Sequence, residues 1–377
     1  MPGAIHAITM PRWGMTMTEG VVSAWLVDVG ATVAQGQEIL EIETEKIANA
    51  YEAGASGLLR RRLIEPPATA SVGALLGVLA DAVVSDVEID QFIADFNVQQ
   101  RAHSAATPAK LAARAVHIAS GAINLMTVGE GSGLPALLLH GFGGDMNSWS
   151  FAQAELGATR TVHALDFPAH GGSSIPATSL TVESLARAVA DALGAIGVPR
   201  VHLVAHSLGG TVSLLLARDR PEFVASLSLI APAGLGPEID ADYIEAFLSA
   251  ERRPQMKQAL ASLFADPGQM RREMVDDVLR FMRADGVPQA LRSLAADAFP
   301  GGRQRLVLRD LVASCAAPVQ VIWGAEDRII PAAHAQSLPA GVPVHVIPAA
   351  GHMVHLEQAN RVDALLAAFL SRVEAKQ

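Results

Sequence analysis

The stretch Val201-His202-Leu203-Val204-Ala205-His206-Ser207-Leu208-Gly209-Gly210 decides the fold of the larger part of this chain. Val201–Val204 is an apolar run typical of a buried strand, and it leads into small residues around Ser207. The stretch matches the turn G-x-S-x-G, which places a nucleophilic serine between a strand and a helix, with Ala205 in place of the first glycine. Alanine is the smallest alternative to glycine, so we expect the strained turn to form. A serine here is also compatible with a plain helix N-cap.

Two further motifs supply partners for Ser207. The segment Trp323–Pro331 follows an apolar strand-like run and contains Asp327, and His352 follows the next such run. The chain order serine, aspartate, histidine is that of α/β-hydrolases. We therefore predict that His352 takes the proton of Ser207 and that Asp327 orients the imidazole. Glu326 is a competing acid, but its longer side chain and earlier position make it the second choice.

An earlier motif completes the predicted site. His140-Gly141-Phe142-Gly143-Gly144 follows the apolar run Ala136–Leu139. The backbone N–H groups of Phe142 and Leu208 are predicted to form the oxyanion hole. We predict no metal, because the sequence has no Cys and His cluster with metal-ligand spacing.

Three histidines near these motifs are expected to have other roles. His140 and His206 lie within packed turns and are expected to be structural. His355 follows His352 by one helical turn, and we expect it either at the mouth of the site or at the surface.

From about residue 116 onward, strand-like and helical segments alternate. This order predicts an α/β-hydrolase domain over residues 116–375, with a mostly parallel sheet covered by helices on both faces. Residues 235–312 interrupt the alternation with segments of helical period, and they predict a helical lid over the carboxyl edge of the sheet. The strand-like runs are Ile123–Val128, Ala136–Leu139, Val162–Leu165, Val201–Val204, Ala225–Ile230, Val319–Trp323 and Val344–Ile347. The helical segments of the lid are Tyr243–Arg252, Met256–Phe264 and Met270–Arg283.

Residues 1–80 have a different pattern, in which short β-rich segments are separated by glycines. The segment Ala31–Gly36 resembles Ala68–Gly73, and an apolar run follows each copy. Two similar half-units predict a small all-β sandwich with a pseudo-twofold axis. Residues 81–115 combine helical spacing with a polar stretch rich in Ala, Ser and Pro, so we expect a short helix followed by a linker.

Lys46 is the candidate for covalent modification. It lies in Glu43-Thr44-Glu45-Lys46-Ile47-Ala48, between two strand-like segments. A lysine at the tip of a hairpin presents its amine to solvent, where a modifying ligase has access. From this context alone, an ordinary surface lysine is the simpler interpretation.

A family resemblance changes that interpretation. Residues 1–80 resemble the lipoyl domain of 2-oxoacid dehydrogenase acyltransferase subunits, which implies that lipoate is attached to Lys46 through an amide bond. Biotin carriers share the fold but usually have Met on each side of the lysine, whereas Glu45 and Ile47 flank it here. The segments that carry the resemblance are Met10–Gly20, Gly30, Gly36 and Glu43–Lys46.

The whole chain, a lipoyl-type carrier followed by an α/β-hydrolase domain, resembles the dihydrolipoamide acetyltransferase components of bacterial acetoin dehydrogenase complexes. The H-x-x-x-D-G motif of most acyltransferase subunits is absent. The resemblance implies transfer of acetyl from a dihydrolipoyl-lysine arm to coenzyme A. It also implies three kinds of partner: a thiamine-diphosphate-dependent component that cleaves acetoin, a dihydrolipoamide dehydrogenase, and further copies of the chain in a homo-oligomeric core.

Two other functions use the same residues. The triad could pass the acyl group to water, which would make the protein a thioesterase or esterase with a lipoyl domain. Alternatively, the chain could be a swinging-arm carrier and scaffold whose hydrolase domain has no catalytic role. The intact triad pattern argues against the scaffold, and the fusion to a carrier argues against a free-standing esterase.

Composition excludes several classes of protein. Half of the 377 residues are hydrophobic, which rules out a wholly disordered chain. The net charge of −10, with no basic run longer than Arg60-Arg61-Arg62, argues against nucleic-acid binding. We expect no membrane span, since no apolar run approaches about 20 residues. The absence of a signal peptide and the single cysteine, Cys315, favour the cytoplasm.

Overall fold

The fold is described from a computed structural model of the chain, which covers residues 5–11, 19–43, 48–105, 113–270 and 272–375. The chain divides into two compact units between Ala109 and Lys110. The first unit contains the carrier fold, and the second contains the hydrolase fold.

The first unit is built from two four-stranded sheets, with strand orders β1-β8-β6-β3 and β5-β4-β2-β7. Their inner faces share one apolar core, to which Ile8 and Leu59 contribute from the first sheet and Val22 and Ile42 from the second. The predicted all-β sandwich is therefore confirmed. The strands are β1 (Ile5–Thr9), β2 (Glu19–Trp25), β3 (Thr32–Val33), β4 (Glu38–Glu43), β5 (Ala48–Glu52), β6 (Gly57–Arg62), β7 (Ala68–Ser71) and β8 (Leu75–Ala80).

Helix α1 (Asp86–Ala105) packs on the outer face of the first sheet. Its Ile89 is fully buried against Val78 of β8, which explains why every residue of β8 is buried. The helix begins with a capping box, in which Ser85 Oγ accepts from the Glu88 N–H and the Glu88 carboxylate accepts from the Ser85 N–H.

The expectation of a short helix followed by a linker was wrong at the carboxyl end of this helix. The helix has 20 residues, so residues 99–105 are helical rather than linker. Gln, Arg and Ala are good helix formers, and the first residue that breaks a helix is Pro108.

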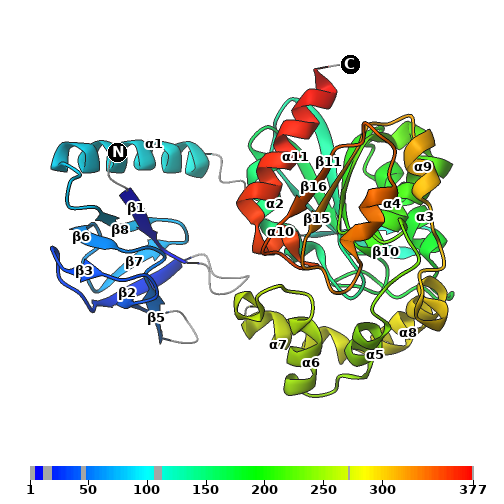
Figure 1. Cartoon of the computed structure of the whole chain (residues 1–377), viewed down its shortest axis with the longest axis horizontal. Helices are drawn as coiled ribbons and strands as arrows, with labels where there is room; N and C mark the ends of the chain where they lie inside the picture. Colours follow the sequence, from blue (N-terminus) through cyan, green and yellow to red (C-terminus); the bar gives the residue numbers. More distant parts are fainter. Residues whose placement is uncertain (1–4, 12–18, 44–47, 106–112, 271, 376–377) are drawn as a thin grey trace. The chain divides into compact units, whose positions relative to one another are not determined.

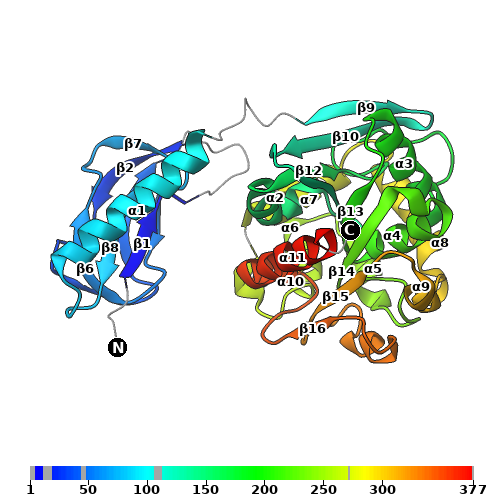
Figure 2. The ribbon, with the colours of Figure 1, turned by 90° about the horizontal axis from the view of Figure 1, so that it is seen from above.

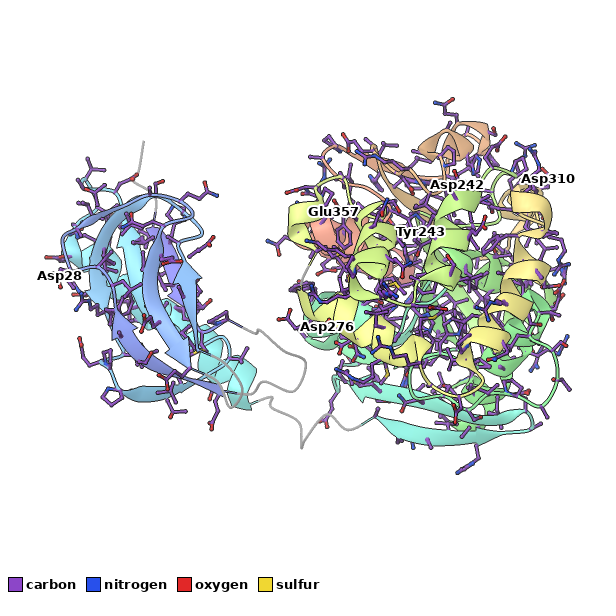
Figure 3. All side chains as sticks on the ribbon, turned by 90° about the horizontal axis from the view of Figure 1, so that it is seen from below. Asp28, Asp242, Tyr243, Asp276, Asp310 and Glu357 are labelled. Carbon is purple, nitrogen blue, oxygen red and sulfur yellow. The ribbon has the colours of Figure 1, made fainter. Side chains whose placement is uncertain are left out.

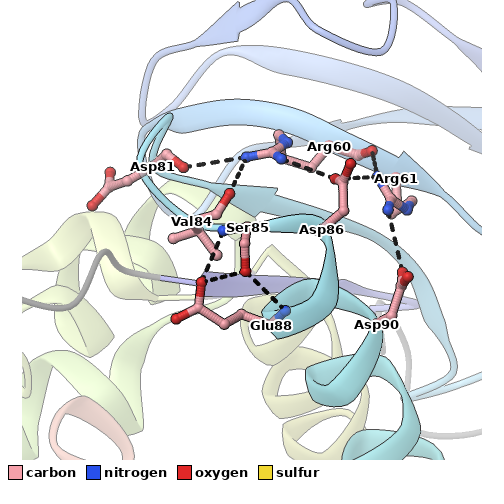
Figure 4. Close-up of polar contacts among 8 residues, drawn as sticks. All are labelled: Arg60, Arg61, Asp81, Val84, Ser85, Asp86, Glu88 and Asp90. Carbon is pink, nitrogen blue, oxygen red and sulfur yellow. Dashed lines mark hydrogen bonds and ion pairs between the residues drawn. The ribbon is translucent and has the colours of Figure 1, made fainter.

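Two arginines of β6 join the start of α1 to the sheet (Figure 4). Arg60 and Arg61 both donate to Asp86 Oδ1, at 3.0 and 3.1 Å, and Arg61 also reaches Asp90 at 3.2 Å. Arg60 further donates to the carbonyl of Val84 at 2.9 Å. The hydrogen bonds from Arg60 and Arg61 lower the pKa of the Asp86 carboxyl. Exposed ion pairs of this kind contribute little individually, but together they fix where the helix leaves the sheet.

The second unit contains one eight-stranded sheet of order β16-β15-β14-β13-β11-β12-β10-β9. Strands β11 to β16 are parallel to one another, whereas β10 pairs antiparallel with both β12 and the edge strand β9. The predicted mostly parallel sheet is confirmed. The strands are β9 (Arg114–Ile118), β10 (Gly121–Val128), β11 (Gly133–Leu139), β12 (Arg160–Leu165), β13 (Val201–His206), β14 (Val224–Ile230), β15 (Val319–Gly324) and β16 (Val344–Ile347).

Helices cover both faces of this sheet (Figures 1 and 2). Along β11, Leu137 and Leu139 face the core that includes α3 and α4, while Ala136 and Leu138 face the core that includes α2 and α11. The helices are α2 (Ser150–Gly157), α3 (Val182–Ala195), α4 (Leu208–Asp219), α9 (Arg309–Ser314), α10 (Val354–Glu357) and α11 (Ala359–Glu374). Short 3₁₀ helices span Met146–Trp149, Pro221–Phe223, Pro267–Gln269, Pro300–Gly302 and Ala332–Ser337.

Four helices between β14 and β15 form a separate group at one end of the sheet (Figure 1). Aromatic rings join them to the loops that follow β11 and β12. The ring centroids of Phe247 and Phe142 lie 5.9 Å apart. Those of Phe281 and His170 lie 6.0 Å apart. The group, here called the lid, therefore lies over the carboxyl ends of the strands. The helices are α5 (Ala241–Ser249), α6 (Arg253–Ala261), α7 (Arg272–Met282) and α8 (Val287–Ala298), and only α8 was not among the predicted segments.

Two kinds of feature are absent from the residues that the structure describes. No helix among them is long and apolar enough to cross a membrane. The same residues contain no group of three or more His, Cys, Asp or Glu side chains arranged to hold a metal ion.

One buried acid makes stability depend on pH. Asp363 on α11 is buried, and its Oδ1 has no hydrogen-bond partner among the described residues. Burial, together with the nearby charge of Glu155, raises the pKa of the Asp363 carboxyl to about 7. In an unfolded chain this pKa is about 3.9. The folded protein holds the Asp363 proton more tightly than the unfolded chain does. The contribution of the protonated carboxyl to the free energy of unfolding is therefore complete below about pH 4 and is lost as the pH rises through about 7.

We therefore expect Asp363→Asn to increase the free energy of unfolding by the order of a few kcal/mol at pH 8 and to have little effect at pH 4. Asparagine keeps the size of the side chain and cannot ionise. Urea titrations at both pH values measure the difference. An equal effect at both pH values would show that the carboxyl does not titrate in this range.

Candidate active site

Ser207 lies in a strained turn between β13 and α4. Its backbone has φ 52° and ψ −120°, a region that costs a non-glycine residue of order 1–3 kcal/mol. Three backbone hydrogen bonds hold this conformation: Ser207 donates to Ile230 at 3.0 Å and accepts from Gly210 and Ala233 at 2.8 and 2.9 Å. The serine is thus held at the carboxyl end of a central strand, in the geometry of a nucleophile elbow.

The turn needs small residues because neighbouring chain segments pass close to it. A Cβ at Gly209 would lie 2.6 Å from the carbonyl oxygen of Leu139, and one at Gly210 would lie 2.6 Å from Pro232. Ala205, which stands where the first glycine is usual, is fully buried in regular strand between β11 and β14. Its methyl group is accommodated there, so the departure from the motif does not disturb the turn.

Asp327 and His352 form a buried hydrogen-bonded pair. His352 Nδ1 lies 2.9 Å from Asp327 Oδ2, and the two side chains are 3% and 0% exposed. The same carboxyl accepts from the backbone N–H groups of Ile329 and Ile330, at 2.8 and 3.0 Å, and from the Trp323 indole at 2.9 Å. Four donors directed at two oxygens suit a carboxylate, which can only accept. The His352 nitrogen that faces it, Nδ1, must therefore donate and carries the ring proton. This leaves Nε2 of His352 as an acceptor.

Glu326 does not compete with Asp327 for the imidazole. Its carboxylate accepts from the Ala350 N–H at 2.8 Å, and its own N–H donates to the Ala350 carbonyl at 3.0 Å. Glu326 therefore joins the loop after β15 to the loop before His352.

Trp323 is a residue of this site for which the sequence predicted only a place at the end of a strand. It is fully buried, and its indole N–H is shared between Asp327 Oδ2 at 2.9 Å and the Ile330 carbonyl at 3.0 Å. A buried indole N–H needs a hydrogen-bond acceptor. A tryptophan four residues before an acid was therefore the feature of the sequence that could have predicted this contact. Trp323 therefore helps to fix the carboxylate that holds His352.

The Ser207 hydroxyl and the His352 imidazole share no hydrogen bond within the described residues. Such bonds are often long in enzymes without substrate and shorten when substrate binds. The two residues belong to segments that touch, since His206 Nε2 donates to the His352 carbonyl at 2.9 Å.

The two predicted oxyanion donors lie on segments that meet at Ser207. Leu208 is the first residue of α4, so its N–H has no acceptor within the helix. Phe142 follows Gly141, where an added Cβ would lie only 3.0 Å from the Ser207 Cβ. The structure thus brings both predicted donors next to the serine.

His355 occupies a different environment from the one expected. It is buried, its ring lies 4.5 Å from that of His206 and 4.7 Å from that of Trp149, and neither ring nitrogen has a partner among the described residues. Burial, with the neighbouring His352, lowers the pKa of His355 to about 3. The expectation that His355 lies at the mouth or the surface was therefore wrong, because its ring is buried between those of His206 and Trp149.

Glu357, the last residue of α10, is labelled in Figure 3. It joins the His352 loop to the lid. Its carboxylate accepts from the N–H of Gly351 at 2.7 Å and from the N–H of Ala265 at 2.8 Å. Gly351 precedes His352, and Ala265 lies between α6 and α7. The position of the lid is thus coupled to the loop that carries the imidazole.

Lys46 lies outside the described residues, in the connection between β4 and β5. Register pairs on either side of it, Glu43 with Ala48 and Ile42 with Asn49, define an antiparallel hairpin. Lys46 is one of the four residues that separate these paired positions in the sequence.

Two family models match the chain, one to each unit. Residues 135–359 match the alpha/beta hydrolase fold, and residues 6–79 match the family described as biotin-requiring enzyme, which includes lipoyl carriers. Among solved structures, a meta-cleavage product hydrolase from Pseudomonas fluorescens superimposes with a TM-score of 0.62. It is 21% identical and covers 69% of this chain and 97% of its own, so the likeness shows the fold alone.

Full-length relatives define the family more narrowly. The chain is 41% identical to the dihydrolipoyllysine-residue acetyltransferase component of the acetoin cleaving system of Pseudomonas putida, over 98% of this chain and 99% of the relative. The corresponding component from Cupriavidus necator is 42% identical over 96% of both chains. Because these matches extend through both units, the chain belongs to the family of dihydrolipoyllysine-residue acetyltransferase components of acetoin cleaving systems.

Proposed function

We propose that this acetyltransferase passes the acetyl group from a dihydrolipoyl-lysine arm on Lys46 to coenzyme A through an acetyl ester on Ser207. The observation that carries the proposal is the buried Asp327–His352 pair, on a segment that touches the one holding Ser207 in a strained elbow. A serine hydroxyl is a weak nucleophile until a base removes its proton, and this arrangement supplies the base and its orienting acid.

In the first half-reaction, Ser207 Oγ attacks the carbonyl carbon of the acetyl thioester while His352 Nε2 takes the hydroxyl proton. The negative charge that develops on the carbonyl oxygen is stabilised by the N–H groups of Phe142 and Leu208. The carbon–sulfur bond then breaks, and His352 returns the proton to the departing sulfur. Asp327 stabilises the imidazolium throughout.

In the second half-reaction, the thiol of coenzyme A gives its proton to His352, and its sulfur attacks the acetyl ester on Ser207. The ester bond breaks, and His352 returns the proton to Ser207 Oγ. The products are acetyl-coenzyme A and the free enzyme, so no oxidant or reductant is consumed.

The lid supplies what a transferase needs beyond a hydrolase. Water would compete with coenzyme A for the ester unless the site were closed to solvent. Lid aromatics pack against Phe142, and Glu357 ties the lid loop to the His352 loop, so the lid is joined to both sides of the site.

A lipoyl group on Lys46 would present the acetyl group as a thioester at a high effective concentration, because carrier and acceptor belong to one chain. The acetoin cleaving system in the names of the relatives suggests the other components. We propose a thiamine-diphosphate-dependent component that loads the arm, a dihydrolipoamide dehydrogenase that reoxidises it, and a homo-oligomeric core of this chain. We place the complex in the cytoplasm.

The test supplies acetyl-dihydrolipoamide to the purified full-length protein with and without coenzyme A. With coenzyme A, we expect continuous formation of acetyl-coenzyme A. Without it, we expect a single burst of dihydrolipoamide, about one per active site, and an acetyl group on the peptide that contains Ser207, detected by mass spectrometry.

The absence of a Ser207 burst would overturn the proposal, and so would either of two other outcomes. Acetate released at the same rate with and without coenzyme A would identify a hydrolase. No turnover of either kind would identify a carrier and scaffold whose hydrolase unit is not catalytic.

A further inference from the structure

His140 is buried at the start of the loop that carries Phe142, and its imidazole is held on both sides by backbone groups. Its Nε2 lies 3.0 Å from the Phe167 N–H, which can only donate, so Nε2 is an acceptor. Its Nδ1 therefore carries the proton, and it lies 2.7 Å from the carbonyl oxygen of Gly141. The imidazole thus donates to one chain segment and accepts from another.

The acceptor of this hydrogen bond belongs to the same peptide group as the oxyanion donor. The Gly141 carbonyl and the Phe142 N–H form one planar trans peptide unit, so they point in opposite directions. Directing the carbonyl toward His140 turns the Phe142 N–H away from it. A hydrogen bond to the carbonyl also polarises the peptide group and strengthens its N–H as a donor.

The rest of the loop is held in the same way. The Gly144 N–H makes a second hydrogen bond to the Gly141 carbonyl at 3.2 Å. The Gly143 N–H donates to Nε2 of His170 at 3.2 Å, and His170 Nδ1 lies 3.0 Å from the Pro168 carbonyl. Burial lowers the pKa of His140 to about 4 and that of His170 to about 3. Both rings are therefore neutral near pH 7, as acceptance at Nε2 requires.

We propose that His140 is a positioning residue for the acetyl transfer, which acts by orienting the Gly141–Phe142 peptide group so that the Phe142 N–H serves the oxyanion hole. This goes beyond the structural role expected for His140 from the sequence. The inference rests on the proposed function, because it requires an oxyanion to form at Ser207.

The test compares substitutions that keep different parts of the imidazole. His140→Leu keeps much of the bulk and removes both hydrogen bonds. His140→Asn places an amide nitrogen near the position of Nδ1 and can still donate to Gly141, whereas His140→Gln reaches the position of Nε2 and keeps the contact to Phe167 instead.

We expect His140→Leu to lower kcat by roughly 100-fold, the effect typical of losing one oxyanion donor. The KM for acetyl-dihydrolipoamide should change less than threefold, because the interaction matters only when charge develops. The kcat of His140→Asn should be at least tenfold higher than that of His140→Leu. The kcat of His140→Gln should be lower than that of His140→Asn. If His140→Leu does not fold, the order of the Asn and Gln variants still decides the question.

A matched control is His202→Asn, which removes another buried histidine with two hydrogen bonds, to Ser226 at 2.7 Å and Glu374 at 3.0 Å. It should reduce stability and leave kcat within twofold of the wild type. A His140→Leu variant with kcat within threefold of the wild type, or a Gln variant as active as the Asn variant, would overturn the inference. If the wild type itself shows no Ser207 burst, the proposed function fails; if the burst is present and the His140 variants do not slow it, only this inference fails.

Discussion

The Ser207→Ala variant is expected to form acetyl-coenzyme A from acetyl-dihydrolipoamide with kcat lower than that of the wild type by a factor of roughly 10⁴ to 10⁶. The substitution removes the atom that is proposed to form the acetyl ester, while Asp327, His352 and the two proposed oxyanion donors stay in place. The remaining activity would come from direct attack of the coenzyme A thiol on the thioester within the same site. Stopped assays of acetyl-coenzyme A measure the loss directly.

A serine in the adjoining helix α4 provides a control, which shows whether the loss of kcat comes from the missing nucleophile or from altered packing. Ser213 on α4 is fully buried, and its hydroxyl has no hydrogen-bond partner among the described residues. We expect Ser213→Ala to leave kcat within twofold of the wild type. If Ser207→Ala kept kcat within tenfold of the wild type, the acetyl group would pass directly from thiol to thiol, and the ester on Ser207 would not be an intermediate.

The Lys46→Arg variant is expected to abolish acetyl-coenzyme A formation from acetoin in the assembled complex and to leave transfer from free acetyl-dihydrolipoamide unchanged. Arginine keeps a positive charge at the hairpin but offers no amine for an amide bond to lipoate. The covalent arm is lost, while the hydrolase unit that carries the triad candidates is untouched. Intact mass spectrometry checks the modification, and the two assays measure the two activities in parallel.

Lys257→Arg provides the matched comparison, because Lys257 is an exposed lysine on α6 of the lid. That variant should retain the lipoyl mass and both activities. A Lys46→Arg protein that still carries the lipoyl mass would place the attachment on another lysine. Retained turnover from acetoin without any lipoyl mass would mean that the acetyl group reaches the hydrolase unit without a covalent arm.

Features that depend on a few neighbouring residues were predictable from the sequence. The strand and turn around Ser207 follow from an apolar run and a cluster of small residues, and the turn has the strained backbone that the motif predicts. The carrier sandwich and the mostly parallel sheet follow from hydrophobic period and glycine spacing, and both are confirmed. The length of α1 was misjudged, because a polar segment rich in Ala and Ser forms a helix when no proline or glycine stops it.

Features that depend on contacts between distant segments were not predictable. The sequence put Asp327 first and Glu326 second as the acid for the imidazole, but only the structure shows that the hydrogen bond goes to Asp327 while Glu326 binds the backbone of Ala350. The parallel pairing of β15 with β16 determines this choice, because it sets which side chain of one loop faces the other. The place of His355, against the rings of Trp149 and His206, likewise depends on contacts between distant segments.

What the sequence by itself determined is the set of candidate groups: a serine in a turn of small residues, an acid and a histidine in hydrolase order, and a lysine between two strand-like segments. These depend on local backbone geometry and residue type, which a short segment contains. Only the tertiary structure decided how the groups are oriented, including the imidazole proton on Nδ1 of His352, which faces Asp327, and the Nε2 of His140, which accepts from the Phe167 N–H. Hydrogen bonds act over about 3 Å, and only folding brings residues so distant in the chain that close together.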